Sequence, residues 1–129
     1  MQVMNHKQVI KYFLSKPESL LDHPFGPDVE VYKVKGKMFA TFGILNEKPA
    51  INLKCEPDEA VILRDIFDAV IPGYHMNKRL WNTIFLDQSV PKGEIERMID
   101  NSYMLVVKGL KKIEREHLIL QYGKDKLGL

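Results

Sequence analysis

Cysteine is nearly absent from this chain, since Cys55 is the only one among its 129 residues. A single cysteine excludes an internal disulfide and is typical of a reducing compartment. The N-terminus lacks a basic segment followed by an apolar one, and no apolar run approaches the ~20 residues of a membrane span. We therefore expect a cytoplasmic protein that does not associate with a membrane.

A strong excess of charge of one sign is also missing. The net charge is +2 and the isoelectric point is about 8.6, below the value of roughly 9 that marks strongly electrostatic nucleic-acid binders. The charge is nevertheless unevenly distributed, because residues 29–54 carry a net +3 and residues 56–68 a net −4. This pattern predicts a basic side formed by the sheet and an acidic side formed by a helix.

Recognisable catalytic and metal-binding patterns are missing as well. The four histidines lie in separate predicted elements, without the spacing of zinc ligands. Lys35-Gly36-Lys37 lacks the following helix that a phosphate-binding loop needs. Cys55 alternates inward with Ile51 and Leu53, which predicts a small core residue rather than a nucleophile. We expect no catalytic residues, no cofactor and no metal, and hence no enzyme.

The first half of the chain contains signals for one helix and three strands. Asn5 is suited to cap a helix that ends at Pro17 and whose apolar stripe consists of Val9, Ile10, Phe13 and Leu14. Residues 20–28 are rich in turn formers and predict an ordered loop. Strands are expected at 29–34, 38–42 and 50–55, the first two joined by a tight hairpin at 35–37.

The second half predicts two helices and two strands. A helix begins at Pro57, a strand covers 83–87 with residues 74–77 as its antiparallel neighbour, and a long helix begins at Pro91. Small residues on the stripe of the long helix predict close packing against the sheet. These small residues of the long helix are Ser102 and Gly109. The buried face of the second helix is expected to consist of Val61, Ile62, Ile66 and Phe67.

The element order α-β-β-β-α-β-β-α predicts an α+β fold in which helices cover one face of an antiparallel sheet. A chain of this length fits a single domain over residues 1–129. Residues 111–129 are basic with interspersed apolar positions, and we assign them as a C-terminal extension of this domain.

The segment from Pro72 to Thr83 is the most polarised stretch of the chain. Its twelve residues include two cations, a tyrosine, a histidine, two carboxamides and the only tryptophan, but no carboxylate. Pro72-Gly73 predicts a turn in which Gly73 adopts a positive φ. The segment has the chemistry of a surface for an anionic, partly aromatic partner. Alternatively, its aromatic side chains anchor a connection onto the core and its cations are ordinary solvated charges.

Several phrases of the sequence resemble the signature blocks of one family. They are Phe25-Gly26-Pro27-Asp28, Lys33-Val34-Lys35-Gly36-Lys37-Met38-Phe39-Ala40, Asn52-Leu53-Lys54-Cys55, the segment Pro72 to Thr83, and Ile99-Asp100-Asn101-Ser102-Tyr103-Met104-Leu105-Val106. Together they resemble the MmcQ/YjbR-like family over about residues 20–110. The resemblance implies a frataxin-like (CyaY-like) double-wing fold and a DNA-binding label without enzymatic activity. Frataxins bind iron through an acidic first helix, whereas the first helix here carries lysines, which argues against that role.

Two functional hypotheses follow. In the first, the domain binds nucleic acid, with hairpin lysines and the Pro72–Thr83 segment contacting phosphates and a tyrosine or tryptophan stacking on a base. In the second, it is a non-enzymatic binding domain for a small anionic ligand or a protein, with His75, Asn77, Lys78 and Asn82 as a polar pocket. The nucleic-acid-binding residues predicted are Lys33, Lys35, Lys37, Lys54, Tyr74, His75, Asn77, Lys78, Arg79, Trp81 and Asn82.

The same segment allows predictions for individual side chains. We expect at least half of Trp81 to be buried, because an indole near a turn usually anchors the chain. His75 and Asn82 are expected to be mainly structural, with Lys78 and Arg79 facing solvent. Two or three ammonium groups of the hairpin lysines are expected to gather on one side, as a like-charge cluster that costs stability unless an anionic partner neutralises it.

Overall fold

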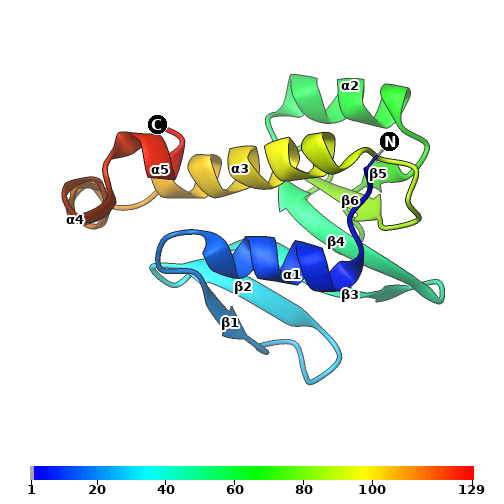
Figure 1. Ribbon diagram of the computed structural model, residues 1–129, viewed down its shortest axis with the longest axis horizontal. Helices are drawn as coiled ribbons and strands as arrows, with labels where there is room; N and C mark the ends of the chain where they lie inside the picture. The colour runs from blue at the N-terminus through cyan, green and yellow to red at the C-terminus, as the bar shows by residue number, and fades with distance from the viewer. Residues whose placement is uncertain (1) are drawn as a thin grey trace.

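The structure is a computed structural model that describes residues 2–129. Its centre is a six-stranded antiparallel sheet in the order β1-β2-β3-β4-β6-β5 (Figure 1). The strands are β1 Leu20–Asp22, β2 Glu30–Val34, β3 Lys37–Leu45, β4 Lys48–Lys54, β5 Val70–Pro72 and β6 Trp81–Phe85. The helices are α1 His6–Ser15, α2 Pro57–Ile66, α3 Lys92–Lys108, α4 Lys112–Tyr122 and α5 Lys124–Leu127.

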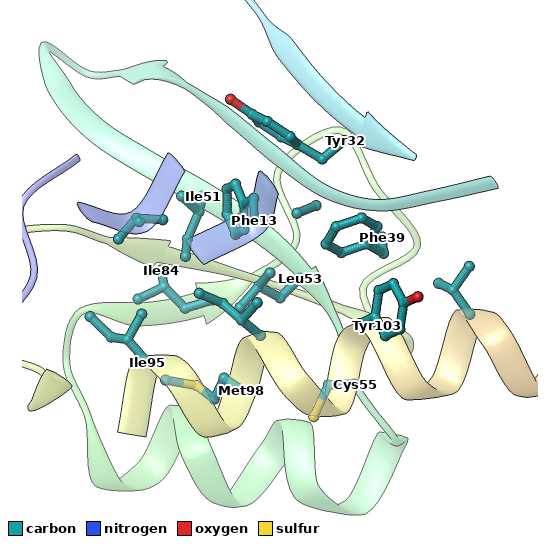
Figure 2. Packing of buried hydrophobic residues seen from close by; sticks show 14 of the residues in the cluster. Phe13, Tyr32, Phe39, Ile51, Leu53, Cys55, Ile84, Ile95, Met98 and Tyr103 are labelled. Carbon is teal, nitrogen blue, oxygen red and sulfur yellow. The ribbon is translucent and has the colours of Figure 1, made fainter. Parts of the chain in front are cut away.

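Helices α1 and α3 lie across one face of the sheet, and the core forms between these layers (Figure 1). Figure 2 shows Phe13 of α1 beside Phe39 and Tyr32, and Tyr103 of α3 directed toward Phe39. The predicted α+β fold with helices on one face is therefore confirmed. None of the helices in residues 2–129 has the length and apolar character needed to cross a membrane.

The first helix begins where the sequence predicts. Asn5 and Gln8 form a capping box, in which each side chain accepts a hydrogen bond from the backbone N–H of the other. Val9 and Phe13 are fully buried. Ile10 is partly buried against the core, whereas Leu14 is 48% exposed, so the predicted stripe is the contact face of α1 except at Leu14.

A β-bulge brings Phe39 into the core. Strand β3 pairs with β2 through Ala40 and Met38, so Phe39 is an extra residue opposite the step from Tyr32 to Lys33. The Ser102 hydroxyl donates to the Phe39 carbonyl at 2.6 Å and accepts from the Lys54 N–H at 2.8 Å. Ser102 is fully buried, which confirms the predicted close packing at this position.

Four local predictions were wrong. Residues 20–22 form the edge strand β1 within the predicted loop, and β6 begins at Trp81 rather than at Thr83. Its antiparallel neighbour is Val70–Pro72 rather than residues 74–77. Gly109 does not pack on the sheet but ends α3, where an added Cβ would meet only carbonyl oxygens of its own helix.

The buried face of α2 also differs from the prediction. Val61, Ile62 and Ile66 are 50%, 55% and 63% exposed, while Ala60 and Leu63 are buried. The helix has apolar residues on two sides, and the side that carries Ala60 and Leu63 faces the sheet. Of the predicted face, only Phe67, just beyond the end of α2, packs against the core. Periodicity alone therefore selected the wrong side of α2.

The C-terminal residues form part of the same core. Leu118 of α4 and Leu127 of α5 are buried in the cluster that also contains the sheet residues. His117 Nδ1 lies 3.2 Å from Lys35 Nζ at the β2–β3 turn. The segment 111–129 is thus two helices packed at the end of α3 (Figure 1).

Candidate functional site

A cavity of about 730 Å³ opens on the sheet face opposite α1 and α3. Strands β3, β4 and β6 form its floor, and loop residues form its walls. Phe25 and Asp28 come from the loop after β1, and Tyr74, His75 and Met76 from the loop after β5. The full lining is Phe25, Asp28, Val29, Thr41, Gly43, Ile44, Leu45, Ala50, Asn52, Tyr74, His75, Met76 and Thr83.

Three polar side chains cross the floor in one row. Thr41 pairs with Asn52 in the β3–β4 register, and Asn52 pairs with Thr83 in the β4–β6 register. Asn52 Nδ2 donates to Thr41 Oγ1 at 3.0 Å, and the Thr83 hydroxyl donates to Asn52 Oδ1. Thr83 Oγ1 also accepts from the Tyr74 N–H at 2.9 Å. The row therefore connects the three strands to the loop that carries the aromatic wall.

The wall residues Tyr74 and His75 are positioned by a strained turn. His75 has a φ of 59°, a conformation that non-glycine residues rarely adopt. Its ring lies against that of Tyr74, with centroids 4.1 Å apart. Both side chains are exposed. The prediction that His75 is mainly structural is wrong in one respect, because its ring is at the cavity rather than in the interior.

Gly73 is needed for a different reason from the one the sequence suggested. Its φ is not among the positive values of the chain. A Cβ at this position would instead lie 2.9 Å from Trp81 Cβ and 3.0 Å from the Trp81 carbonyl. The loop passes too close to β6 for a side chain, so glycine is required by lack of space.

The hairpin lysines do not form an unneutralised cluster. Lys33 pairs with Asp22 at 2.8 Å, and Lys35 pairs with Glu18 at 3.0 Å. The hydrogen bond from Lys33 holds the pKa of Asp22 below its ordinary value. Lys37 is exposed at the start of β3. The predicted basic wing is thus largely neutralised by acids of the preceding segment.

The cations after β5 face solvent, as predicted. Lys78 and Arg79 are exposed. The Lys78 ammonium donates to the Gly73 carbonyl at 3.0 Å, and the Asn77 side chain accepts from the Arg79 N–H at 3.0 Å. Asn77 and Lys78 thus stabilise the turn from within, while the guanidinium of Arg79 is presented at the surface.

Two of the remaining predicted residues, Trp81 and Asn82, are neighbours in β6 and so point to opposite faces of the sheet. Trp81 is half-buried, which confirms the expectation for its indole, and it pairs with Lys54 across β6 and β4. Asn82 is 2% exposed and donates to the Ala60 carbonyl of α2 at 3.3 Å. The structural role predicted for Asn82 is confirmed. Asn82 and Trp81 thus do not line the cavity with Tyr74.

Cys55 lies in the core as predicted. It is 7% exposed, and burial raises the pKa of its thiol to about 11, with a further contribution from the Glu59 carboxylate. A neutral thiol is a poor nucleophile. Within residues 2–129, no group of three His, Cys, Asp or Glu side chains is arranged to hold a metal ion.

Several lining residues were not proposed as site residues from the sequence. The predicted alternation of Ile51, Leu53 and Cys55 implies that Asn52 faces away from the core, but the site depends on the alignment of Asn52 with Thr41 and Thr83. These residues are 11 and 31 positions away from Asn52, so strand register alone brings them together. Phe25 and Asp28 belong to one of the family's signature blocks, and this membership was the sequence signal that could have identified them as site residues.

Comparisons with known proteins agree with this arrangement. A family model described as YjbR matches residues 14–105, a span that includes every residue lining the cavity. The uncharacterized Escherichia coli protein YbdF is 33% identical over 113 residues, covering 88% of this chain and 93% of that protein. The uncharacterized Escherichia coli protein YjbR is 30% identical over 116 residues, covering 90% of this chain and 98% of that protein.

Solved structures are similar as well. The crystal structure of Deinococcus radiodurans protein DR2400 superposes with a TM-score of 0.81 at 33% identity, covering 92% of this chain and 88% of that one. A crystal structure of a Pseudomonas syringae protein gives a TM-score of 0.70 at 31% identity, covering 79% of this chain and 98% of that one. The fold that positions the cavity is thus shared with these proteins.

Proposed function

The chain belongs to the YjbR family, and from that premise we propose that it is a non-enzymatic binding domain whose site is the cavity over Thr41, Asn52 and Thr83. One observation carries the proposal. Segments far apart in the sequence, at residues 25–29, 41–52 and 74–83, converge on one hollow of about 730 Å³. Ligand pockets commonly enclose about 300 to 1,000 Å³ and combine apolar walls with a few placed polar groups.

The lining favours binding over catalysis. Its titratable side chains are Asp28, Tyr74 and His75, and the hydroxyls of Thr41 and Thr83 are engaged in the hydrogen-bonded row. An activated nucleophile needs a base within hydrogen-bond reach. The Thr83 hydroxyl instead contacts an amide and a backbone N–H, neither of which is a base.

The lining also favours a ligand without strong negative charge. Asp28 contributes a carboxylate, and the lining contains neither lysine nor arginine. A small anion would therefore meet an acid at the rim and no compensating cation in the wall. This departs from the anionic ligand that the sequence suggested.

A ligand screen by thermal shift tests the proposal. Phe25 and Ile44 line the cavity and are 67% and 66% exposed, so the double variant Phe25→Ala/Ile44→Ala should keep the fold. The control is Ile113→Ala/Leu120→Ala, which removes two apolar side chains of α4 that are 77% and 88% exposed and lie outside the cavity. Compounds that stabilise the wild type and the control but not the cavity variant support the site. Hits that stabilise all three proteins equally contradict it.

Nucleic-acid binding is a second candidate, supported by the loop after β5. Tyr74 is 48% exposed there, in the same loop as exposed Lys78 and Arg79. An aromatic ring beside cations is a common platform for a single strand. The ion pairs of Lys33 and Lys35 make the hairpin a weaker phosphate contact than the sequence suggested.

Salt dependence tests this second candidate. Each phosphate contact contributes a slope of roughly −0.7 to −0.9 to log K against log salt. The variant Lys78→Ala/Arg79→Ala should therefore reduce the slope for DNA by up to about 2. Lys7→Ala/Lys11→Ala, on the opposite face at exposed positions of α1, is the matched control. Equal slopes in both variants would remove the loop from DNA binding.

A further inference from the structure

The hydrogen bonds of the floor involve both ends of the Asn52 amide. The Thr83 hydroxyl accepts the Tyr74 N–H and donates to Asn52 Oδ1. The Asn52 amino group donates to Thr41 Oγ1. The amide oxygen thus faces Thr83, and the amino group faces Thr41.

This orientation leaves a donor and an acceptor of Asn52 unused by the floor. A carboxamide has two N–H donors and two oxygen lone pairs. Thr41 and Thr83 flank Asn52 in the same cross-strand row, so they engage the hydrogen and the lone pair that point sideways. In a planar amide, the other N–H and the other lone pair are nearly parallel to each other and point away from the floor. They form an adjacent donor and acceptor at the base of the cavity.

An adjacent donor and acceptor can form two hydrogen bonds with a ligand edge that carries an acceptor and a donor side by side. Such an edge occurs in cyclic amides and amidines, and every nucleobase has one. Asparagine is a common partner of such edges in proteins, where it bonds two neighbouring atoms of one base. The polar floor is thus suited to the edge of a planar heterocycle.

The walls are suited to the faces of such a ring. Phe25 and Tyr74 offer exposed aromatic side chains from opposite loops, with His75 packed on Tyr74. Aromatic side chains stack on bases irrespective of sequence because every base has a π-face. The Asp28 carboxylate at the wall would accept from an exocyclic amino group and would repel a phosphate.

We infer that the cavity binds a nucleobase-type ring, with Asn52 pairing to its edge and Phe25 stacking on its face. This inference rests on the proposed binding function and specifies its ligand class. The ring has two possible sources, a free nucleoside or an unpaired base of a single strand. In the second case the phosphates lie outside the cavity, where Lys78 and Arg79 are exposed.

Titration calorimetry with adenosine, guanosine, cytidine and uridine, and separately with a mixed-sequence single-stranded DNA 12-mer, tests the inference. Asn52→Asp keeps the shape but removes both N–H donors, and we expect it to weaken binding at least tenfold. Phe25→Ala, at an exposed position, should weaken binding without changing the melting temperature. The Phe25→Ala variant keeps the test valid even if the Asn52→Asp variant does not fold. Ribose 5-phosphate, which lacks the base, should not bind.

The outcomes separate the possibilities. Binding of a nucleoside that depends on Phe25 and Asn52 supports the inference with a free ligand, and binding of the 12-mer alone with the same dependence supports it with a strand. Binding that both variants leave unchanged overturns it. If neither probe binds while the wider screen finds other ligands that depend on Phe25 and Ile44, this inference fails and the proposed function stands. A screen without any cavity-dependent ligand removes the proposed function itself.

Discussion

The hydroxyl of Thr83 donates to Asn52 Oδ1 while it accepts the backbone N–H of Tyr74. One side chain of β6 thereby fixes both the amide at the floor of the cavity and the loop that forms its wall. Thr83 is 1% exposed, so these bonds are shielded from water. The geometry of the site is thus coupled to the stability of the sheet.

Thr83→Val should lower the free energy of unfolding by about 1 to 3 kcal/mol, because a buried N–H and a carboxamide oxygen lose their partner. Urea unfolding measures the change. Thr83→Ser is the matched control, since it keeps the hydroxyl and removes only a methyl group. A Val variant as stable as the Ser variant would contradict the assigned hydrogen bonds.

Ser102→Ala should destabilise the protein by roughly 2 kcal/mol or more, since the Phe39 carbonyl and the Lys54 N–H both lose a bond at the bulge. Ser15→Ala serves for comparison, because that hydroxyl contacts Tyr12 in an exposed part of α1. Its effect should be well under 1 kcal/mol. Equal effects of the two substitutions on urea unfolding would argue against a role of Ser102 in joining β3 and β4.

Two substitutions in α2 test which side of the helix is buried. Leu63→Ala should cost about 2 to 5 kcal/mol because Leu63 is 3% exposed. Ile66→Ala should cost within about 0.5 kcal/mol because Ile66 is 63% exposed. Thermal unfolding of the two variants gives the comparison directly. A larger loss of stability in Ile66→Ala than in Leu63→Ala would instead support the buried face that the sequence pattern predicted.

Cys55 should react slowly with thiol reagents in the folded protein. Its pKa of about 11, against an ordinary 9.0, lowers the thiolate fraction at pH 8. The fraction falls from ~10% to ~0.1%, so alkylation should be about 100-fold slower. Iodoacetamide labelling in buffer and in 8 M urea, followed by mass spectrometry, measures the ratio. The absence of a second cysteine makes the assignment direct, and equal rates would show that the thiol is accessible.

The layout of the fold could be predicted from the sequence because it follows local signals. The Asn5 cap, the alternation through Ile51 and Leu53, and the stripe of the long helix each act over a few residues. The buried face of α2 could not be predicted from the sequence, because Val61 and Ile66 are as apolar as the residues of α2 that the sheet covers. Only the tertiary packing of Ala60 and Leu63 decides between the two sides.

The candidate site was predicted in part. The signature segment at Pro72–Thr83 identified Tyr74 and His75, which line the cavity. The sequence did not show that Lys33 and Lys35 pair with acids. Asp22 comes from a strand that was read as a loop, and Glu18 comes from the turn between α1 and that strand. The floor escaped detection because register across β3, β4 and β6 is set by the whole sheet.

The most direct test of a ligand site on this sheet face is chemical-shift mapping with ¹⁵N-labelled protein. A ligand from the screen is titrated while backbone and side-chain amides are followed. We predict the largest shifts at the Asn52 side-chain amide and at the Tyr74 and His75 N–H groups. Shifts that cluster instead on the hairpin around Lys35, or on α2, with Asn52 unchanged, would contradict the assignment of the cavity as the binding site.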